Sequence, residues 1–145
     1  MNENELDLSL GDLKLNIRSI ERFVEEAGMP YRDWLKCDVR VSVPSFSGSV
    51  EWDVMPGELR TLADQLQRLY DAFPTRGSVA FQPTEPKVTL SFEITRTGAV
   101  AGRYEIRNEF VAGDVLAGAF QIEQSVLPRL VNDIRAFVDA AVSAA

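Results

Sequence analysis

Apolar and polar residues alternate along several short stretches of this chain, which is the pattern of strands with one buried face. Residues 6–10 and 13–17 form the first such pair, separated by Gly11-Asp12, and predict an opening hairpin. The alternation recurs in six further stretches, residues 39–43, 46–54, 79–81, 88–94, 100–110 and 116–122. Most neighbouring stretches are joined by short turns, which favours antiparallel pairing.

Two other segments have the spacing of amphipathic helices, with apolar residues three and four positions apart. The first begins at Pro56, and its apolar stripe continues to Phe73. The second follows Ser125, a candidate N-cap, and has Pro128 in its first turn. Residues 18–28 are ambiguous, because their apolar residues have helical spacing while the charged residues between them suit a helix or a strand.

This order of elements predicts an α+β fold: a mostly antiparallel β-sheet of about seven to eight strands with two amphipathic helices packed on it. The chain has 145 residues, of which 46% are hydrophobic, enough for a single core. No composition change marks a linker. We therefore expect one domain over residues 1–145.

The charge balance changes the list of expected partners. With 22 acidic and 15 basic residues the formal net charge is −7, so a nucleic acid backbone would be repelled. A basic protein surface is a better electrostatic match, although acidity also serves solubility alone. The acidic start, residues 1–5, does not look like a secretory signal, and no apolar run is long enough to span a bilayer. We expect a cytoplasmic protein that does not bind nucleic acid or membrane.

The chain contains no histidine and a single cysteine, Cys37. There is no Ser-His-Asp or Cys-His relay, no histidine-based metal cage and no intramolecular disulfide. We expect no catalytic residue, metal or cofactor, and a protein that is not an enzyme. An enzyme that uses only carboxylates, with Glu51 or Asp53 as acid or base, remains a minor alternative.

The candidate partner-binding residues lie on two predicted strands and beside a third. Glu51 and Asp53 are two positions apart and share one face of their strand. Arg103, Glu105 and Arg107 likewise share the polar side of theirs, although cross-strand ion pairing alone would explain them. A sixth candidate is a tryptophan, a residue type enriched at binding hot spots. The complete set is Trp34, Glu51, Asp53, Arg103, Glu105 and Arg107.

Several segments from about Tyr31 to Ala140 resemble the WapI-type immunity proteins, antidotes to bacterial polymorphic toxins. They are Asp33-Trp34-Leu35 before a valine-alternating strand, the Phe46-Ser47-Gly48 turn, the Leu59–Leu69 helix, the Val88–Glu93 strand, and Phe120–Ser125 before the last helix. The resemblance implies a non-catalytic protein that binds a cognate toxin domain and occludes its active surface. Charge reversal at Glu51 and Asp53 is then expected to weaken binding to a basic toxin. The alternative is a structural or adaptor subunit, or a homodimeric scaffold, without a toxin partner.

Overall fold

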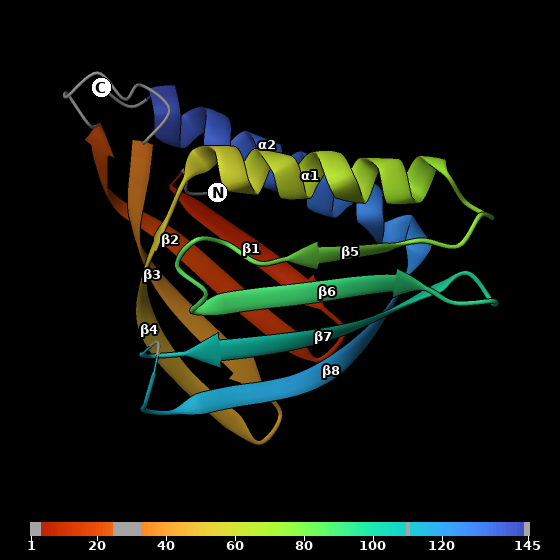
Figure 1. The fold of residues 1–145 in the computed structure, drawn as a ribbon, viewed down its shortest axis with the longest axis horizontal. Helices are drawn as coiled ribbons and strands as arrows, with labels where there is room; N and C mark the ends of the chain where they lie inside the picture. The colour runs from red at the N-terminus through yellow and green to blue at the C-terminus, as the bar shows by residue number, and fades with distance from the viewer. Residues whose placement is uncertain (1–3, 25–32, 110, 144–145) are drawn as a thin grey trace.

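The computed structural model describes residues 4–24, 33–109 and 111–143. Within them, eight strands form two antiparallel sheets of four, and each sheet is followed by a helix (Figure 1). Sheet A consists of β1 (Glu5–Leu10), β2 (Leu13–Val24), β3 (Asp33–Val43) and β4 (Phe46–Val54). Sheet B consists of β5 (Ser78–Phe81), β6 (Val88–Ile94), β7 (Ala99–Arg107) and β8 (Val115–Glu123). In both sheets the spatial order of the strands is their order in the chain.

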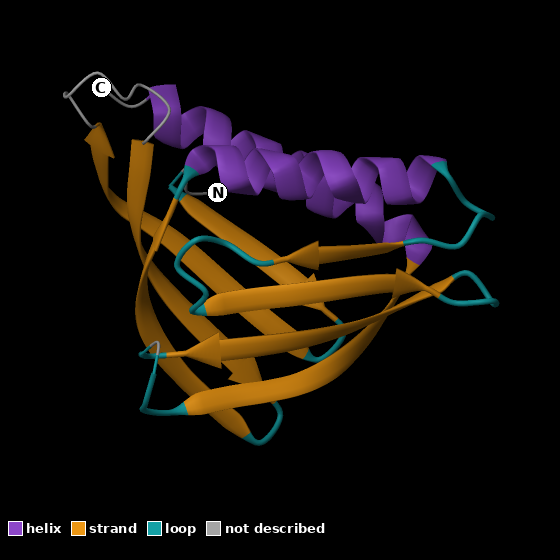
Figure 2. Ribbon diagram, viewed as in Figure 1, coloured by secondary structure: helices purple, strands orange, loops and turns teal. Residues whose placement is uncertain are grey.

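The two helices lie side by side along one flank of the stacked sheets (Figure 2). Helix α1 (Pro56–Asp71) follows β4 and contacts β5, and α2 (Leu127–Ser143) follows β8 and contacts β1. Helix α1 therefore connects sheet A to sheet B, and α2 packs back from sheet B against sheet A. The expected α+β class, with antiparallel strands and two amphipathic helices, is confirmed, and the strands are divided between two sheets.

Period-two alternation gives each sheet one buried and one outer face. The leucines at positions 6, 8 and 10 of β1 are buried, as are Val88, Leu90, Phe92 and Ile94 of β6. These inner faces join the apolar stripes of α1 and α2 in one hydrophobic cluster. Charged residues are excluded from it, and every buried residue of the described chain is apolar or small.

Two helix details differ from the sequence predictions. Ser125 does not begin the last helix: it lies inside a short 3-10 helix, η1 (Gln124–Val126), through which the chain leaves β8 before α2 starts at Leu127. Pro128 does occupy the first turn of α2, as expected. The first helix ends at Asp71, so Phe73 lies beyond it and is 37% exposed. Phe110, expected on a strand, lies outside the described residues.

The ambiguous segment beginning at residue 18 is a strand as far as it is described, because β2 continues to Val24. The pairing of β2 with β3 shifts register between Ser19 and Glu21, which leaves Ile20 as an extra residue. Such a bulge breaks the alternation of buried and exposed positions and explains why the local pattern is not that of a regular strand. Residues 25–28 lie outside the described part of the chain.

Candidate partner-binding surface

The structure separates the six candidate residues into two groups. Trp34 on β3 and Glu51 and Asp53 on β4 belong to the outer face of sheet A. Arg103, Glu105 and Arg107 belong to β7 of sheet B, where they alternate with buried residues. The inner faces of both sheets contribute to the same core, so the two groups lie on different sides of the protein.

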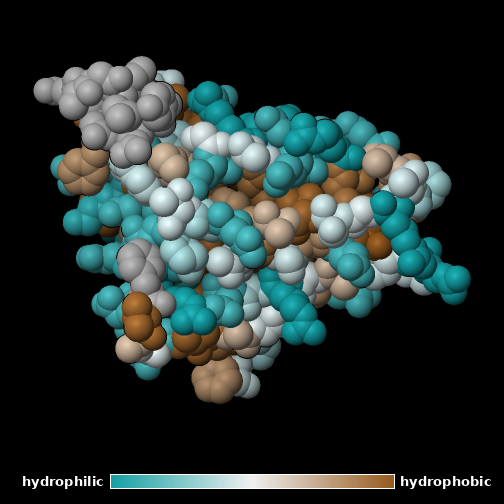
Figure 3. Space-filling view, viewed as in Figure 1, coloured by the Kyte–Doolittle hydropathy of each residue, from teal (hydrophilic) through white to brown (hydrophobic). Residues whose placement is uncertain are grey.

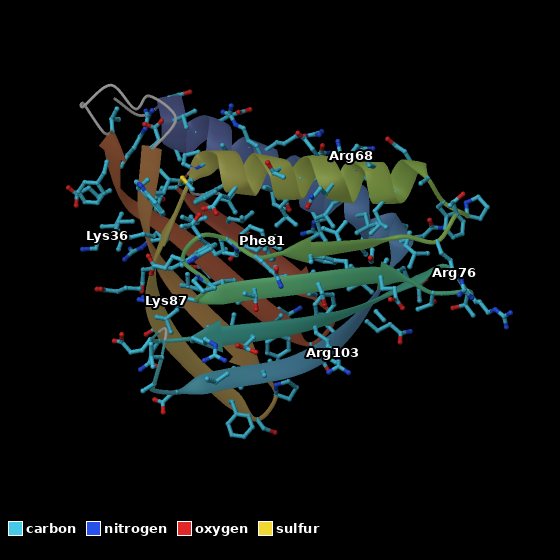
Figure 4. All side chains as sticks on the ribbon, viewed as in Figure 1. Lys36, Arg68, Arg76, Phe81, Lys87 and Arg103 are labelled. Carbon is cyan, nitrogen blue, oxygen red and sulfur yellow. The ribbon has the colours of Figure 1, made fainter. Side chains whose placement is uncertain are left out.

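The two groups approach each other at Lys87, in the loop between β5 and β6. The Lys87 Nζ donates a hydrogen bond of 3.1 Å to the main-chain carbonyl of Glu51. The main-chain N–H of Arg107 donates one of 2.8 Å to the carbonyl of Lys87. Glu51 and Arg107 are therefore held on two sides of the same lysine, whereas Arg103 lies farther along β7 (Figure 4).

On sheet A, much of the outer-face charge is paired within the sheet. Asp38 on β3 lies 3.9 Å from Arg18 on β2 and 3.8 Å from Arg40 on its own strand. Asn16 donates a hydrogen bond of 2.7 Å to Asp7 on β1. Several charged side chains of this face therefore already have an ion-pair or hydrogen-bond partner within the sheet.

Glu51 and Asp53 are near the edge of this paired surface. In the β3–β4 register Glu51 is opposite Asp38 and Asp53 is opposite Lys36. Glu51 is exposed and Asp53 is half-buried. Neither lines the open hollow of about 430 Å³ on the same sheet, whose walls include Lys14 and Arg40. Their carboxylates project from the surface and can contact an approaching cation.

Trp34 lies near the start of β3, on the same face of sheet A as Phe23 of β2. It is half-buried and opposite Phe23 in the strand register. Phe23 is 47% exposed, and its neighbours Ile20 and Val24 are 54% and 56% exposed. Sequence reasoning selected Trp34 but missed these three residues. Their apolar character was visible in the sequence but their exposure was not, and Ile20 is the extra residue of the bulge in β2.

The outer face of sheet B is made mainly of small residues. One row crosses all four strands in register: Ala80 on β5, Ser91 on β6, Arg103 on β7 and Ala119 on β8. The face turned toward the viewer in Figure 3 is mostly hydrophilic or neutral over the sheet, and hydrophobic side chains gather between α1 and the sheet. Arg103 is thus the one large side chain of its row.

The charges of β7 are not equally paired. Glu105 and Arg107 form an ion pair with each other, and both side chains are partly exposed. Arg103 is exposed, and its side chain forms no ion pair or hydrogen bond with any other residue that the structure describes. Glu105 is the nearest carboxylate on the same strand, but it forms its ion pair with Arg107 and not with Arg103.

Open hollows flank Arg103 on both sides. The larger, of about 720 Å³, extends to Glu93, Gln121 and the β1–β2 turn at Asp12. The smaller, of about 280 Å³, extends toward Ala80, Ala117 and Glu105. Arg103 and Ser91 line both. A protruding group of a partner has room to reach the guanidinium from either side.

Glycines on the inner side of β7 and β8 shape this part of the sheet. Gly102 is opposite Phe120, and a Cβ built on Gly102 would lie 2.0 Å from the Phe120 ring. Gly118 is opposite Tyr104, and a Cβ there would lie 2.5 Å from the Tyr104 hydroxyl. Each ring therefore covers the glycine of the neighbouring strand, which fixes β8 closely against β7.

The four edge strands of the two sheets are protected differently. β5 is next to α1 and β1 is next to α2, while Lys87 hydrogen bonds to β4 at Glu51. At β8 the protection covers only one end, where Gly11 of the β1–β2 turn approaches Gln121: a Cβ on Gly11 would lie 3.1 Å from the Gln121 carbonyl oxygen. In the described chain β7 is the only strand hydrogen-bonded to β8.

Cys37 is buried in the inner face of sheet A, opposite Trp52. Burial, together with the negative charge of Asp53, raises the pKa of the Cys37 thiol to about 12. The thiol is therefore protonated at physiological pH and unreactive.

The described residues contain no group of three or more histidine, cysteine, aspartate or glutamate residues placed to hold a metal ion. No helix among them is long and apolar enough to cross a membrane.

Comparison with known proteins identifies the family. The chain matches the model of the immunity protein WapI-like family over residues 7–141, including the first hairpin, which the sequence resemblance did not use. No curated protein matches it. Among solved structures, the plant transcriptional regulator PBF-2 is similar, with 9% identity and a TM-score of 0.47 over 96% of this chain and 82% of that one. On the family match, this chain belongs to the WapI-like immunity protein family.

Proposed function

We propose that this protein neutralises a cognate bacterial toxin by binding it and covering its active surface. The observation that carries the proposal is family membership over residues 7–141, nearly the whole described domain. The surface supports it, because charged groups on the outer faces of both sheets are exposed. Neutralisation by occlusion needs complementary shape and charge and no chemistry by the antidote.

The six candidate residues contribute to this proposal as two contact regions. Glu51 and Asp53 present negative charge to a basic toxin, and Trp34 adds an apolar contact beside Phe23. Arg103, with the Glu105–Arg107 pair farther along β7, presents a cation on sheet B. A toxin domain in contact with both regions would wrap around the corner at Lys87.

The first test is growth of a bacterial host that expresses the C-terminal domain of the large protein encoded beside this chain. Expression of the domain alone should arrest growth, and co-expression of this chain should restore it. Growth arrest despite folded, abundant protein would contradict the proposal. A harmless domain that also fails to co-purify with this chain would favour the structural or adaptor alternative.

A second measurement separates occlusion from an enzymatic antidote. Purified toxin activity should decrease linearly as this chain is added and reach zero at one equivalent. The toxin should regain activity, with unchanged mass, after it is separated from the complex. Complete inactivation by a small fraction of an equivalent would show turnover and overturn the occlusion mechanism.

A further inference from the structure

We propose that the open edge of β8 receives an extended segment of the toxin as an added strand, and that a carboxylate of this segment binds Arg103 across Ala119. This inference rests on the proposed function and specifies where and how the toxin is held. Two independent features of the described residues point to it: the outer edge of β8 and the side chain of Arg103 both lack a partner among them.

The first feature is the composition of β8. Exposed edges are usually protected by lysine, proline, bulges or a covering element, because their main-chain groups can pair with another chain. From Val115 to Gln121 this strand contains no charged residue, no proline and no register shift. Three of its outer-face residues, Val115, Ala117 and Ala119, are exposed. The edge is therefore open and free of the usual protection over this stretch.

The second feature is the position of Arg103, directly opposite Ala119 in the strand register. Adjacent strands lie about 4.8 Å apart, so the residue opposite Ala119 on an added strand would be about 10 Å from the Arg103 backbone. An arginine and a glutamate side chain together span about that distance. Because Ala119 has only a methyl group, nothing larger lies between them.

The surrounding charges leave the middle of β8 open to an incoming carboxylate. Glu93 borders the larger hollow from β6, and Asp12 borders it from the β1–β2 turn, which lies at the Gln121 end of β8. Glu105 borders the smaller hollow but is paired with Arg107. Residues 115–119 of β8 carry no charge, so an incoming carboxylate meets the least repulsion along this part of the strand. The bound partner is thus an extended protein segment with an acidic residue, even where the toxin as a whole is basic.

The test uses the complete chain and a purified, catalytically inactive form of the neighbouring toxin domain. Ala119→Glu places a carboxylate directly opposite Arg103. The new carboxylate would form an ion pair with the guanidinium and repel an acidic segment. We expect affinity to decrease about 30-fold or more. The matched control is Ser49→Glu, an equivalent added charge at an exposed outer-face position of the other long edge strand, β4, which should change affinity less than about threefold.

Hydrogen exchange of the unaltered chain provides a measurement that does not depend on the folding of any variant. Toxin binding should slow exchange at main-chain amides within residues 115–121, because an added strand hydrogen bonds to those amides that point outward. The corresponding amides of β4 should be unaffected.

The outcomes distinguish this inference from the proposed function. Tight toxin binding with unchanged β8 exchange and full affinity of Ala119→Glu overturns the β8 site and leaves the immunity function intact. Failure of the unaltered chain to bind or protect against the toxin contradicts the immunity function itself. A self-associating chain whose β8 amides are protected without toxin, and which becomes monomeric in Ala119→Glu, would assign the edge to a second copy and also overturn the inference.

Discussion

Sheets A and B have the same number of strands in the same order, but the charged side chains of their outer faces are paired to different extents. On sheet A, Asp38 is shared by Arg18 and Arg40, and Asn16 binds Asp7. On sheet B the outer face is mostly alanine, serine and threonine around Arg103, which has no ion-pair partner among the described residues.

This difference teaches how to rank charged surfaces as binding candidates. A pair that is satisfied within the sheet loses its partner or its hydration when another protein docks, so its net contribution to affinity is small. An exposed arginine without a partner gains a charge-assisted hydrogen bond at the cost of its hydration alone. We therefore expect the stronger contact on sheet B, although sheet A has more charged residues.

The largest expected effect comes from reversing one arginine on each sheet. Arg103→Glu should weaken toxin binding about 100-fold, or about 2.7 kcal/mol, because it replaces attraction for a carboxylate by repulsion. Arg40→Glu, at an exposed outer-face position of sheet A, should change affinity less than about threefold. Titration calorimetry at fixed salt compares them. Equal losses would show that the two sheets contribute alike.

The next effect compares glycines of the two sheets and concerns stability. Gly102→Ala on sheet B forces a methyl group into the Phe120 ring and should cost about 2–3 kcal/mol of unfolding free energy. Gly48→Ala on sheet A meets nothing within 4 Å and should change stability by less than about 0.5 kcal/mol. Urea unfolding measures both. An unaffected Gly102→Ala variant would mean that Phe120 moves aside freely.

The buried Cys37 thiol of sheet A predicts that the unfolding free energy depends on pH. The pKa of Cys37 is about 12 in the folded protein, above that of an unfolded cysteine. The folded state therefore holds its proton while the unfolded state loses it, so stability is unaffected below about pH 8 and falls as pH rises from 9 to 12. At pH 10 the loss should be about 1–2 kcal/mol relative to pH 7.

Cys37→Ala is the control for this effect. The variant is less stable at every pH because it leaves a cavity, but it lacks the thiol contribution to the slope. The difference between the two unfolding free energies should narrow by about 1–2 kcal/mol between pH 7 and pH 10. Parallel pH profiles would show that the folded thiol ionises as easily as the unfolded one.

The smallest effect is expected from the acidic residues of sheet A. Reversal of both Glu51 and Asp53 to lysine should lower the association rate with a basic toxin about threefold to tenfold at low salt, because exposed charges steer encounter. The dissociation rate should hardly change. Surface plasmon resonance over a range of salt concentrations separates the rates. A salt-independent loss that resides in the dissociation rate would instead place these carboxylates at the centre of the interface.

Local patterns predicted most of the strands because alternation is a property of neighbouring residues. The ends of β6 and the buried Trp52 follow from it directly. The strand predicted over residues 100–110 is instead β7, Ala99–Arg107, which ends earlier than the prediction. The division into two sheets does not, because β4 and β5 each have an alternating pattern whether or not they pair with each other. In the structure β4 and β5 belong to different sheets, with α1 between them in the chain and in contact with β5.

The candidate residues could be named from the sequence, but their electrostatic state could not. Arg103, Glu105 and Arg107 are equally spaced on one strand, and any neighbouring pair could have formed. Side-chain geometry pairs Glu105 with Arg107 and leaves Arg103 alone. The open edge of β8 was also missed, since a strand segment gives no sign of being the last in its sheet.

The contact of Gly11 with Gln121 has a consequence for the alignment of any added strand. The β1–β2 turn lies against the end of β8, with Gly11 in a left-handed conformation at φ 63°. An incoming strand cannot slide past this turn, so the turn acts as a stop that limits pairing to the stretch before Gln121. With that limit, a toxin segment has few ways to align, and the position of its acidic residue relative to the stop decides whether this antidote recognises it.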